Sequence, residues 1–136
     1  MMRKNVVFDF YRVIYIPENN SLDKDILNIL ASLKKDNIPL YLFTNTREEV
    51  IKELDKENNF LKYFNEVIYN TEYPKPDVKS FEKLINTINS DPFNIIFVDD
   101  SPLNVSVAEE FGIITIPYIG SEDLCIKLNN ILKNDK

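Results

Sequence analysis

The chain has 136 residues, of which 44% are hydrophobic and 28% are charged, and its formal net charge is −6. This length supports one hydrophobic core, so we expect residues 1–136 to form a single domain. The acidic balance makes non-specific binding to nucleic acid or to an anionic membrane unfavourable. The chain contains no histidine. Acid–base chemistry would therefore fall to carboxylates, tyrosine or lysine, and an oxygen-rich metal site would suit Mg²⁺ rather than zinc.

Two features of the sequence concern the cellular compartment. Cys125 is the single cysteine, so no internal disulfide can form, which fits a reducing environment. No apolar run is long enough for a signal peptide or a membrane span. We therefore expect a cytoplasmic protein without membrane attachment.

Five short apolar segments have the length and composition of β-strands, and segments with helical spacing separate them. The predicted strands are residues 5–10, 38–43, 66–69, 94–98 and 113–116. Residues 11–20, which precede the first helix, are predicted to be irregular. Strands that alternate with helices indicate an α/β fold with a parallel sheet covered on both faces.

Capping residues mark the predicted helix boundaries. The predicted starts are a cap at Ser21, a capping box formed by Thr46 and Glu49, a cap at Asp77, a cap at Ser101 followed by Pro102, and the acidic turn that begins at Ser121. Gly112 is predicted to end the fourth helix in a left-handed conformation, and residues 134–136 are predicted to fray.

Polar side chains follow several of these strands. Asp9 ends the first strand, Thr44 follows the second, and Asp99 and Asp100 end the fourth. Lys75 lies between two prolines after the third strand. Ligands of open α/β sheets bind at the carboxyl ends of the strands. Three carboxylates with one lysine and no histidine are typical of a site for a hard cation and an anionic substrate.

Each of these residues also has a purely structural interpretation. Asp9 can be a turn residue, Thr44 can cap a strand end, and a lysine such as Lys75 is most often solvated. The two aspartates of the fourth strand can cap the helix that follows, although Ser101 already provides that cap. The order of the four stretches along the chain favours the functional interpretation.

The four stretches resemble the motifs of the haloacid dehalogenase (HAD) superfamily of α/β hydrolases and phosphatases, and the resemblance covers nearly the whole chain. Its most specific parts are Lys75-Pro76-Asp77 and Asp99-Asp100-Ser101-Pro102-Leu103-Asn104-Val105, followed by Ala108 and Phe111-Gly112-Ile113. The resemblance implies a three-layer Rossmann-like fold with a central parallel sheet of about five strands flanked by helices.

The resemblance also implies roles for the matching residues. Asp9 matches the family nucleophile, which forms an aspartyl-phosphate. Thr44 matches the hydroxyl that binds the transferring group, with the backbone amide of Asn45 beside it. Lys75 matches the lysine that holds the nucleophile and neutralises the phosphoryl oxygens. The catalytic residues implied are thus Asp9, Tyr11, Thr44 and Lys75, and the substrate-binding residues are Thr44, Asn45 and Lys75.

The implied cofactor is Mg²⁺. Asp100 matches the residue that binds the metal directly, and Asp99 supports it. Asp9 and the backbone carbonyl of Tyr11 complete the implied metal site.

The sequence departs from the phosphatases of this family at two positions. Tyr11 stands where they carry a second aspartate, which protonates the leaving group and then activates water. Arg12 replaces the glycine that commonly follows. Tyrosine, with an ordinary pKa of about 10, can donate a proton but is a poor base near neutral pH. We therefore expect slow release of the phosphoenzyme, or a bias toward good leaving groups, and we expect Arg12 to point to solvent.

No segment is long enough for a cap domain, so the site is predicted to be open to water. The first interpretation is a capless, magnesium-dependent hydrolase of the phosphatase type that acts on a phosphorylated small molecule or macromolecule. The second is a non-catalytic member that binds such a partner. A dehalogenase comes third, because 2-haloacid dehalogenases carry tyrosine at the position of Tyr11. An open site is also compatible with a homodimer in which one subunit covers the other.

Overall fold

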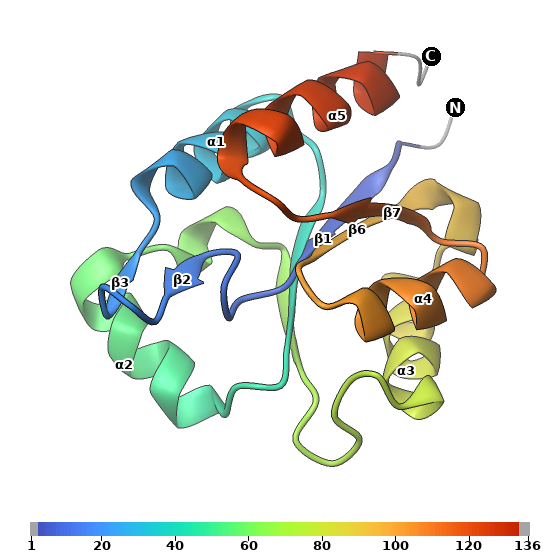
Figure 1. The fold of residues 1–136 in the computed structure, drawn as a ribbon, viewed down its shortest axis with the longest axis horizontal. Helices are drawn as coiled ribbons and strands as arrows, with labels where there is room; N and C mark the ends of the chain where they lie inside the picture. The colour runs from blue at the N-terminus through green and yellow to red at the C-terminus, as the bar shows by residue number, and fades with distance from the viewer. Residues whose placement is uncertain (1–2, 134–136) are drawn as a thin grey trace.

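The computed structural model describes residues 3–133 and contains a central parallel sheet flanked by helices (Figure 1). The sheet has five strands in the order β5-β4-β1-β6-β7. The strands are β1 (Asn5–Phe8), β4 (Leu40–Thr44), β5 (Glu66–Tyr69), β6 (Ile95–Asp99) and β7 (Ile114–Pro117). The predicted three-layer α/β fold is confirmed, and each predicted strand is present with ends that shift by up to two residues.

Five α-helices cover the two faces of this sheet. They are α1 (Lys24–Lys35), α2 (Glu48–Asn58), α3 (Val78–Ile88), α4 (Pro102–Glu110) and α5 (Ser121–Lys133), with short 3₁₀ helices at Leu61–Tyr63 and Pro92–Asn94. In Figure 1, α1 and α5 lie together on one side of the sheet, and α3 and α4 lie on the other. Within residues 3–133, no further element forms a cap domain.

The alternation of side chains along the strands produces two hydrophobic cores. Val6 and Phe8 of β1 face a core that includes residues of α1, α2 and α5. Val7, between them, faces the opposite core with Phe81 of α3 and Ala108 of α4. Because the strands of the sheet are buried on both faces, their sequences are continuous apolar runs. This burial also holds the carboxyl ends of the strands in a rigid frame.

A small antiparallel hairpin interrupts the segment that was predicted to be irregular. It consists of β2 (Tyr15–Ile16) and β3 (Ser21–Leu22), which pair with each other outside the main sheet. Ser21 therefore lies in a strand, and the prediction that it caps the first helix was wrong. Asp23 is the cap instead, because its carboxylate accepts hydrogen bonds from the backbone amides of Asp25 and Ile26.

The predicted capping box of the second helix was also wrong. Arg47 is the N-cap residue of α2 and makes no side-chain capping bond, while the amide of Thr46 donates to Thr44 Oγ1. The caps at Asp77 and Ser101 are confirmed, since each side chain accepts a bond from a backbone amide of its helix. Gly112 has φ +86°, as predicted for a left-handed helix end. The predicted frayed tail, residues 134–136, lies outside the described residues.

Among residues 3–133, no helix combines the length and the apolar character that crossing a membrane requires.

Candidate active site

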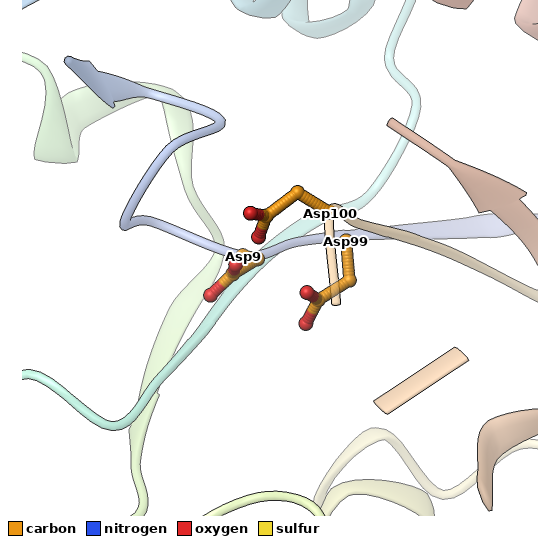
Figure 2. A group of neighbouring side chains, drawn as sticks. All are labelled: Asp9, Asp99 and Asp100. Atoms are coloured by element: carbon orange, nitrogen blue, oxygen red, sulfur yellow. The ribbon is translucent and has the colours of Figure 1, made fainter. Parts of the chain in front are cut away.

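Three aspartates meet at the carboxyl ends of two adjacent strands. Asp9 directly follows β1, and Asp99 and Asp100 lie at the end of β6, its neighbour in the sheet. One carboxylate oxygen from each lies within 4.8 Å of the others, and Figure 2 shows the side chains of Asp99 and Asp100 leaving the backbone in different directions. The chain leaves β1 toward β4 on one side and returns as β6 on the other, so this is the switch point where α/β sheets bind ligands.

Lys75 supplies the positive charge of this cluster. Its Nζ donates hydrogen bonds to Asp9 Oδ1 at 2.8 Å, to the Phe43 carbonyl at 2.8 Å and to Asp99 Oδ2 at 3.1 Å. The ammonium group also lies 5.0 Å from the ring centroid of Phe43. Only 6% of Lys75 is exposed, so its stem packs among aromatic side chains while all three donors of its head are used.

A residue at the end of β4 holds the backbone of Lys75 in place. Asn45, which follows β4, donates through Nδ2 to the Lys75 carbonyl at 3.1 Å and accepts at Oδ1 from the Lys75 amide at 2.8 Å. Thr44 is buried beside it, and its hydroxyl accepts a bond from the Thr46 amide. The side chain of Asn45 thus holds the loop of Lys75 to the end of β4, a role that its position in the sequence did not reveal.

Asp99 is fully buried and saturated with hydrogen bonds. Its Oδ1 accepts from the Ser101 amide at 2.9 Å, and its Oδ2 accepts from Asn104 Nδ2 at 3.0 Å and from Lys75. Asn104 lies on the first turn of α4. Asp99 therefore orients Lys75, while Asp100, which is partly exposed, faces the pocket.

Burial shifts the acidity of the two remaining carboxyl groups. Desolvation raises the pKa of Asp9 from 3.8 to about 7; the charge of Lys75 opposes this shift and that of Asp99 adds to it. The pKa of Asp100 is also raised, first by burial and then by the charge of Asp99. Asp9 is thus a desolvated carboxylate held next to a cation, which is the environment expected of a functional carboxyl group.

Tyr11 and Arg12 form the outer wall of the site. Tyr11 is 48% exposed, and the Arg12 guanidinium lies 5.4 Å from its ring centroid. Arg12 Nη1 also donates to Glu18 Oε2 at 2.9 Å, and this hydrogen bond is the first cause of the raised pKa of Arg12. Arg12 is half exposed, in line with the expectation that it points to solvent, and it also contacts Glu18 and the ring of Tyr11.

These residues line one open pocket of about 400 Å³. The lining includes the predicted residues Asp9, Tyr11, Thr44, Asn45, Lys75 and Asp100, together with Arg12, Thr46, Ser101 and Asn104. Asp99 is absent from this lining, but it accepts a hydrogen bond from Lys75, which lines the pocket. The structure thus brings together all the side chains that the sequence assigned to the site, although Asp9 and Asp100 are 91 positions apart in the sequence.

Several solved structures are similar to this chain in fold. A predicted HAD-like family hydrolase from Porphyromonas gingivalis has a TM-score of 0.80 and 17% identity, covering 98% of this chain and 100% of that chain. An L-2-haloacid dehalogenase has a TM-score of 0.76 and 11% identity, covering 85% and 86%. A HAD family enzyme from Bacteroides thetaiotaomicron, in complex with magnesium and inorganic phosphate, has a TM-score of 0.68 and 18% identity, covering 85% and 93%. At these identities the structures share the fold.

No curated protein matches the chain in sequence. The family model of haloacid dehalogenase-like hydrolases matches residues 3–117, which include every residue of the pocket. The chain therefore belongs to the haloacid dehalogenase-like hydrolase family.

Proposed function

We propose that the protein is a capless, magnesium-dependent phosphohydrolase in which Asp9 is the nucleophile. The observation that carries the proposal is the contact between Asp9 Oδ1 and Lys75 Nζ, at 2.8 Å, on the wall of an open pocket. A desolvated carboxylate beside a fixed ammonium group can attack phosphorus while the cation stabilises the phosphoryl oxygens. The neighbour in complex with magnesium and inorganic phosphate supports the same chemistry.

The donor set fits Mg²⁺. The cluster of Asp9, Asp99 and Asp100 offers only oxygen atoms, and the chain has no histidine to favour zinc. Asp9, Asp100 and the backbone carbonyl of Tyr11 are the proposed ligands, with Asp99 holding the assembly from behind through its hydrogen bonds. When bound, the cation would favour the ionised form of Asp9 and neutralise charge on the substrate.

The proposed reaction has two steps on Asp9. A carboxylate oxygen of Asp9 forms a bond to phosphorus as the bond from phosphorus to the leaving oxygen breaks, and that oxygen takes a proton from the Tyr11 hydroxyl or from water. Water then forms a bond to phosphorus as the bond from phosphorus to the Asp9 oxygen breaks, and the proton that this water loses returns to the Tyr11 oxygen or passes to solvent, which releases phosphate and restores Asp9 and Tyr11. Thr44 and the Asn45 amide are proposed to bind the phosphoryl group. Because Tyr11 is a poor general base near neutral pH, the second step is expected to be slow.

A non-catalytic binding protein is the second candidate. The observation in its favour is Tyr11, which occupies the position expected for the acid–base residue and has the guanidinium of Arg12 5.4 Å from its ring centroid. Such a protein would bind a phosphorylated small molecule or macromolecule without turnover. A dehalogenase is the third candidate. It is weaker, because the pocket retains Asp100, a carboxylate that a metal-free mechanism does not need.

Hydrolysis of an aryl phosphate, measured with and without magnesium, tests these candidates. The wild type is expected to turn over only with magnesium, Asp9→Asn to be inactive, and Tyr11→Asp to be faster than the wild type. Activity that appears only in Tyr11→Asp would favour the binding protein. Halide release from a 2-haloacid without magnesium would favour the dehalogenase.

A further inference from the structure

A second cavity adjoins the reaction pocket, between the β2–β3 hairpin and α2. In Figure 1 the hairpin and α2 lie near each other on one side of the sheet. This cavity, which we name the hairpin groove, has a volume of about 650 Å³, larger than the 400 Å³ of the reaction pocket. Tyr11 and Thr46 line both cavities. A molecule with its phosphoryl group at Asp9 could therefore extend into the hairpin groove past Tyr11.

The floor of the hairpin groove is aromatic and aliphatic. Phe10 and Tyr15 stack with ring centroids 5.7 Å apart, and Tyr11 lies 6.1 Å from Tyr15. Val50 and Leu54 of α2 form the facing wall. Val50 remains 42% exposed, so this apolar surface is accessible. A concave, mainly apolar cavity of this size is typical of sites for organic groups.

The charges of the hairpin groove are all of one sign. Glu49 and Glu53 line it, and its described lining includes no lysine or arginine. Both carboxylates are highly exposed; Glu49 lies 4.0 Å from Arg47 and Glu53 lies 3.2 Å from Lys56, and neither of these cations lines the hairpin groove. The reaction pocket differs, since Lys75 and Arg12 contribute positive charge there. The hairpin groove therefore disfavours an anionic group and accepts a neutral or cationic one.

We propose that the hairpin groove binds the leaving group of the substrate, and that this group is aromatic or otherwise apolar and either neutral or cationic. The inference rests on the proposed function, since it assigns the phosphoryl group to the Asp9 pocket. It predicts phosphate esters of uncharged or amine-bearing aromatic alcohols as the substrate class, and it argues against sugar bisphosphates, nucleoside diphosphates and phosphorylated dicarboxylates.

Phosphonates test this assignment without turnover, because their carbon–phosphorus bond is not hydrolysed. The dissociation constants of methylphosphonate, benzylphosphonate, 4-(aminomethyl)benzylphosphonate and 4-carboxybenzylphosphonate are measured by calorimetry with magnesium. Benzylphosphonate is expected to bind about 10-fold more tightly than methylphosphonate, because its ring is removed from water. The aminomethyl compound is expected to bind at least about 3-fold more tightly than the carboxy compound.

Variants of α2 test whether the hairpin groove causes these differences in affinity. Val50→Asp is expected to reduce the benzyl-to-methyl affinity ratio to about 1. Glu53→Gln is expected to reduce the preference for the aminomethyl compound over the carboxy compound. Glu48→Gln is the matched control, because Glu48 pairs with Lys52 and does not line the hairpin groove, and it is expected to leave both ratios unchanged.

The outcomes separate this inference from the proposed function. Turnover of aryl phosphates with a benzyl-to-methyl ratio near 1 would overturn the groove assignment and leave the hydrolase intact. A high ratio without turnover would support the groove and favour the binding protein. Failure of every phosphonate to bind, together with no turnover of the aryl phosphate, would overturn both. A dimer that Val50→Asp dissociates, combined with a ratio near 1, would assign the hairpin groove to a second copy of the chain and overturn the inference.

Discussion

The side chain of Asn45 brackets the backbone of Lys75, donating to its carbonyl at 3.1 Å and accepting from its amide at 2.8 Å. The ammonium group of the same lysine contacts Asp9 at 2.8 Å. Asn45 therefore links the end of β4 to the loop that presents the cation, and it determines where that cation lies. The position of Lys75 therefore depends on contacts at the ends of β4 and β1, and not on its own loop alone.

Replacing Asn45 by alanine is expected to lower kcat/KM for an aryl phosphate about 10-fold, because a displaced Lys75 no longer faces the phosphoryl oxygens. The loss of the two hydrogen bonds is also expected to reduce the free energy of unfolding by about 1–2 kcal/mol. Asn65→Ala is the control, since the Asn65 side chain accepts a bond from the Leu40 amide away from the site. Equal losses of activity in both variants would contradict the positioning role.

Asp9→Asn is expected to stabilise the metal-free protein at neutral pH while removing its activity. Burial raises the pKa of Asp9 from 3.8 to about 7, so the folded state holds this proton more tightly than the unfolded state. The resulting stability is present below pH 3.8 and is lost as pH rises through about 7. The advantage of the variant should therefore grow over this interval, to the order of 2–4 kcal/mol.

Urea unfolding in the presence of a chelator, between pH 4 and pH 8, measures this difference. Asp91→Asn, the same chemical change at an exposed position, is the control and is expected to show a smaller, flatter difference. A stability difference for Asp9→Asn that does not vary with pH would show that the folded protein does not hold the Asp9 proton.

Tyr118 provides a second pH-dependent prediction, at alkaline pH. Burial, followed by the charges of Asp23 and Asp25, raises the pKa of Tyr118 to about 12. The stability that this raised pKa contributes is present below the ordinary tyrosine pKa of about 10 and is lost as pH rises through 12. The wild type should therefore lose stability relative to Tyr118→Phe above pH 10. Unfolding at pH 9 and pH 11.5 measures this, with Tyr73→Phe as the exposed control, and an unchanged difference would refute it.

Arg12 has φ +68°, a left-handed conformation that glycine adopts without strain. Arg12→Gly is expected to be about 1 kcal/mol more stable than Arg12→Ala, since both variants lose the ion pair with Glu18 and only alanine keeps the strain. The order should reverse at Lys52, inside α2, where glycine is about 1 kcal/mol worse than alanine. Thermal or urea unfolding of the four variants checks both signs, and the same order at both positions would contradict the argument.

Local patterns in the sequence were sufficient for most of the fold. Apolar runs such as Val6-Val7-Phe8 predict buried strands because both of their faces need cover, and Asp77 and Ser101 predict helix starts because they bond to amides two or three residues away. Ser21 was misassigned, since its pairing with Ile16 across the hairpin removes it from the helix start. Thr46 was misassigned because Thr44 already binds its amide.

The sequence by itself determined which residue types stand at the strand ends and in what order, since strand length, capping and chain direction are local properties. Only the tertiary structure decided what those residues do to one another. Lys75 meets Asp9 across 66 positions of sequence, the pKa of Asp9 depends on burial by distant segments, and the hairpin groove exists only where residues 10–20 and α2 converge. Distance, desolvation and cavity shape depend on long-range packing, and no short stretch of sequence contains them.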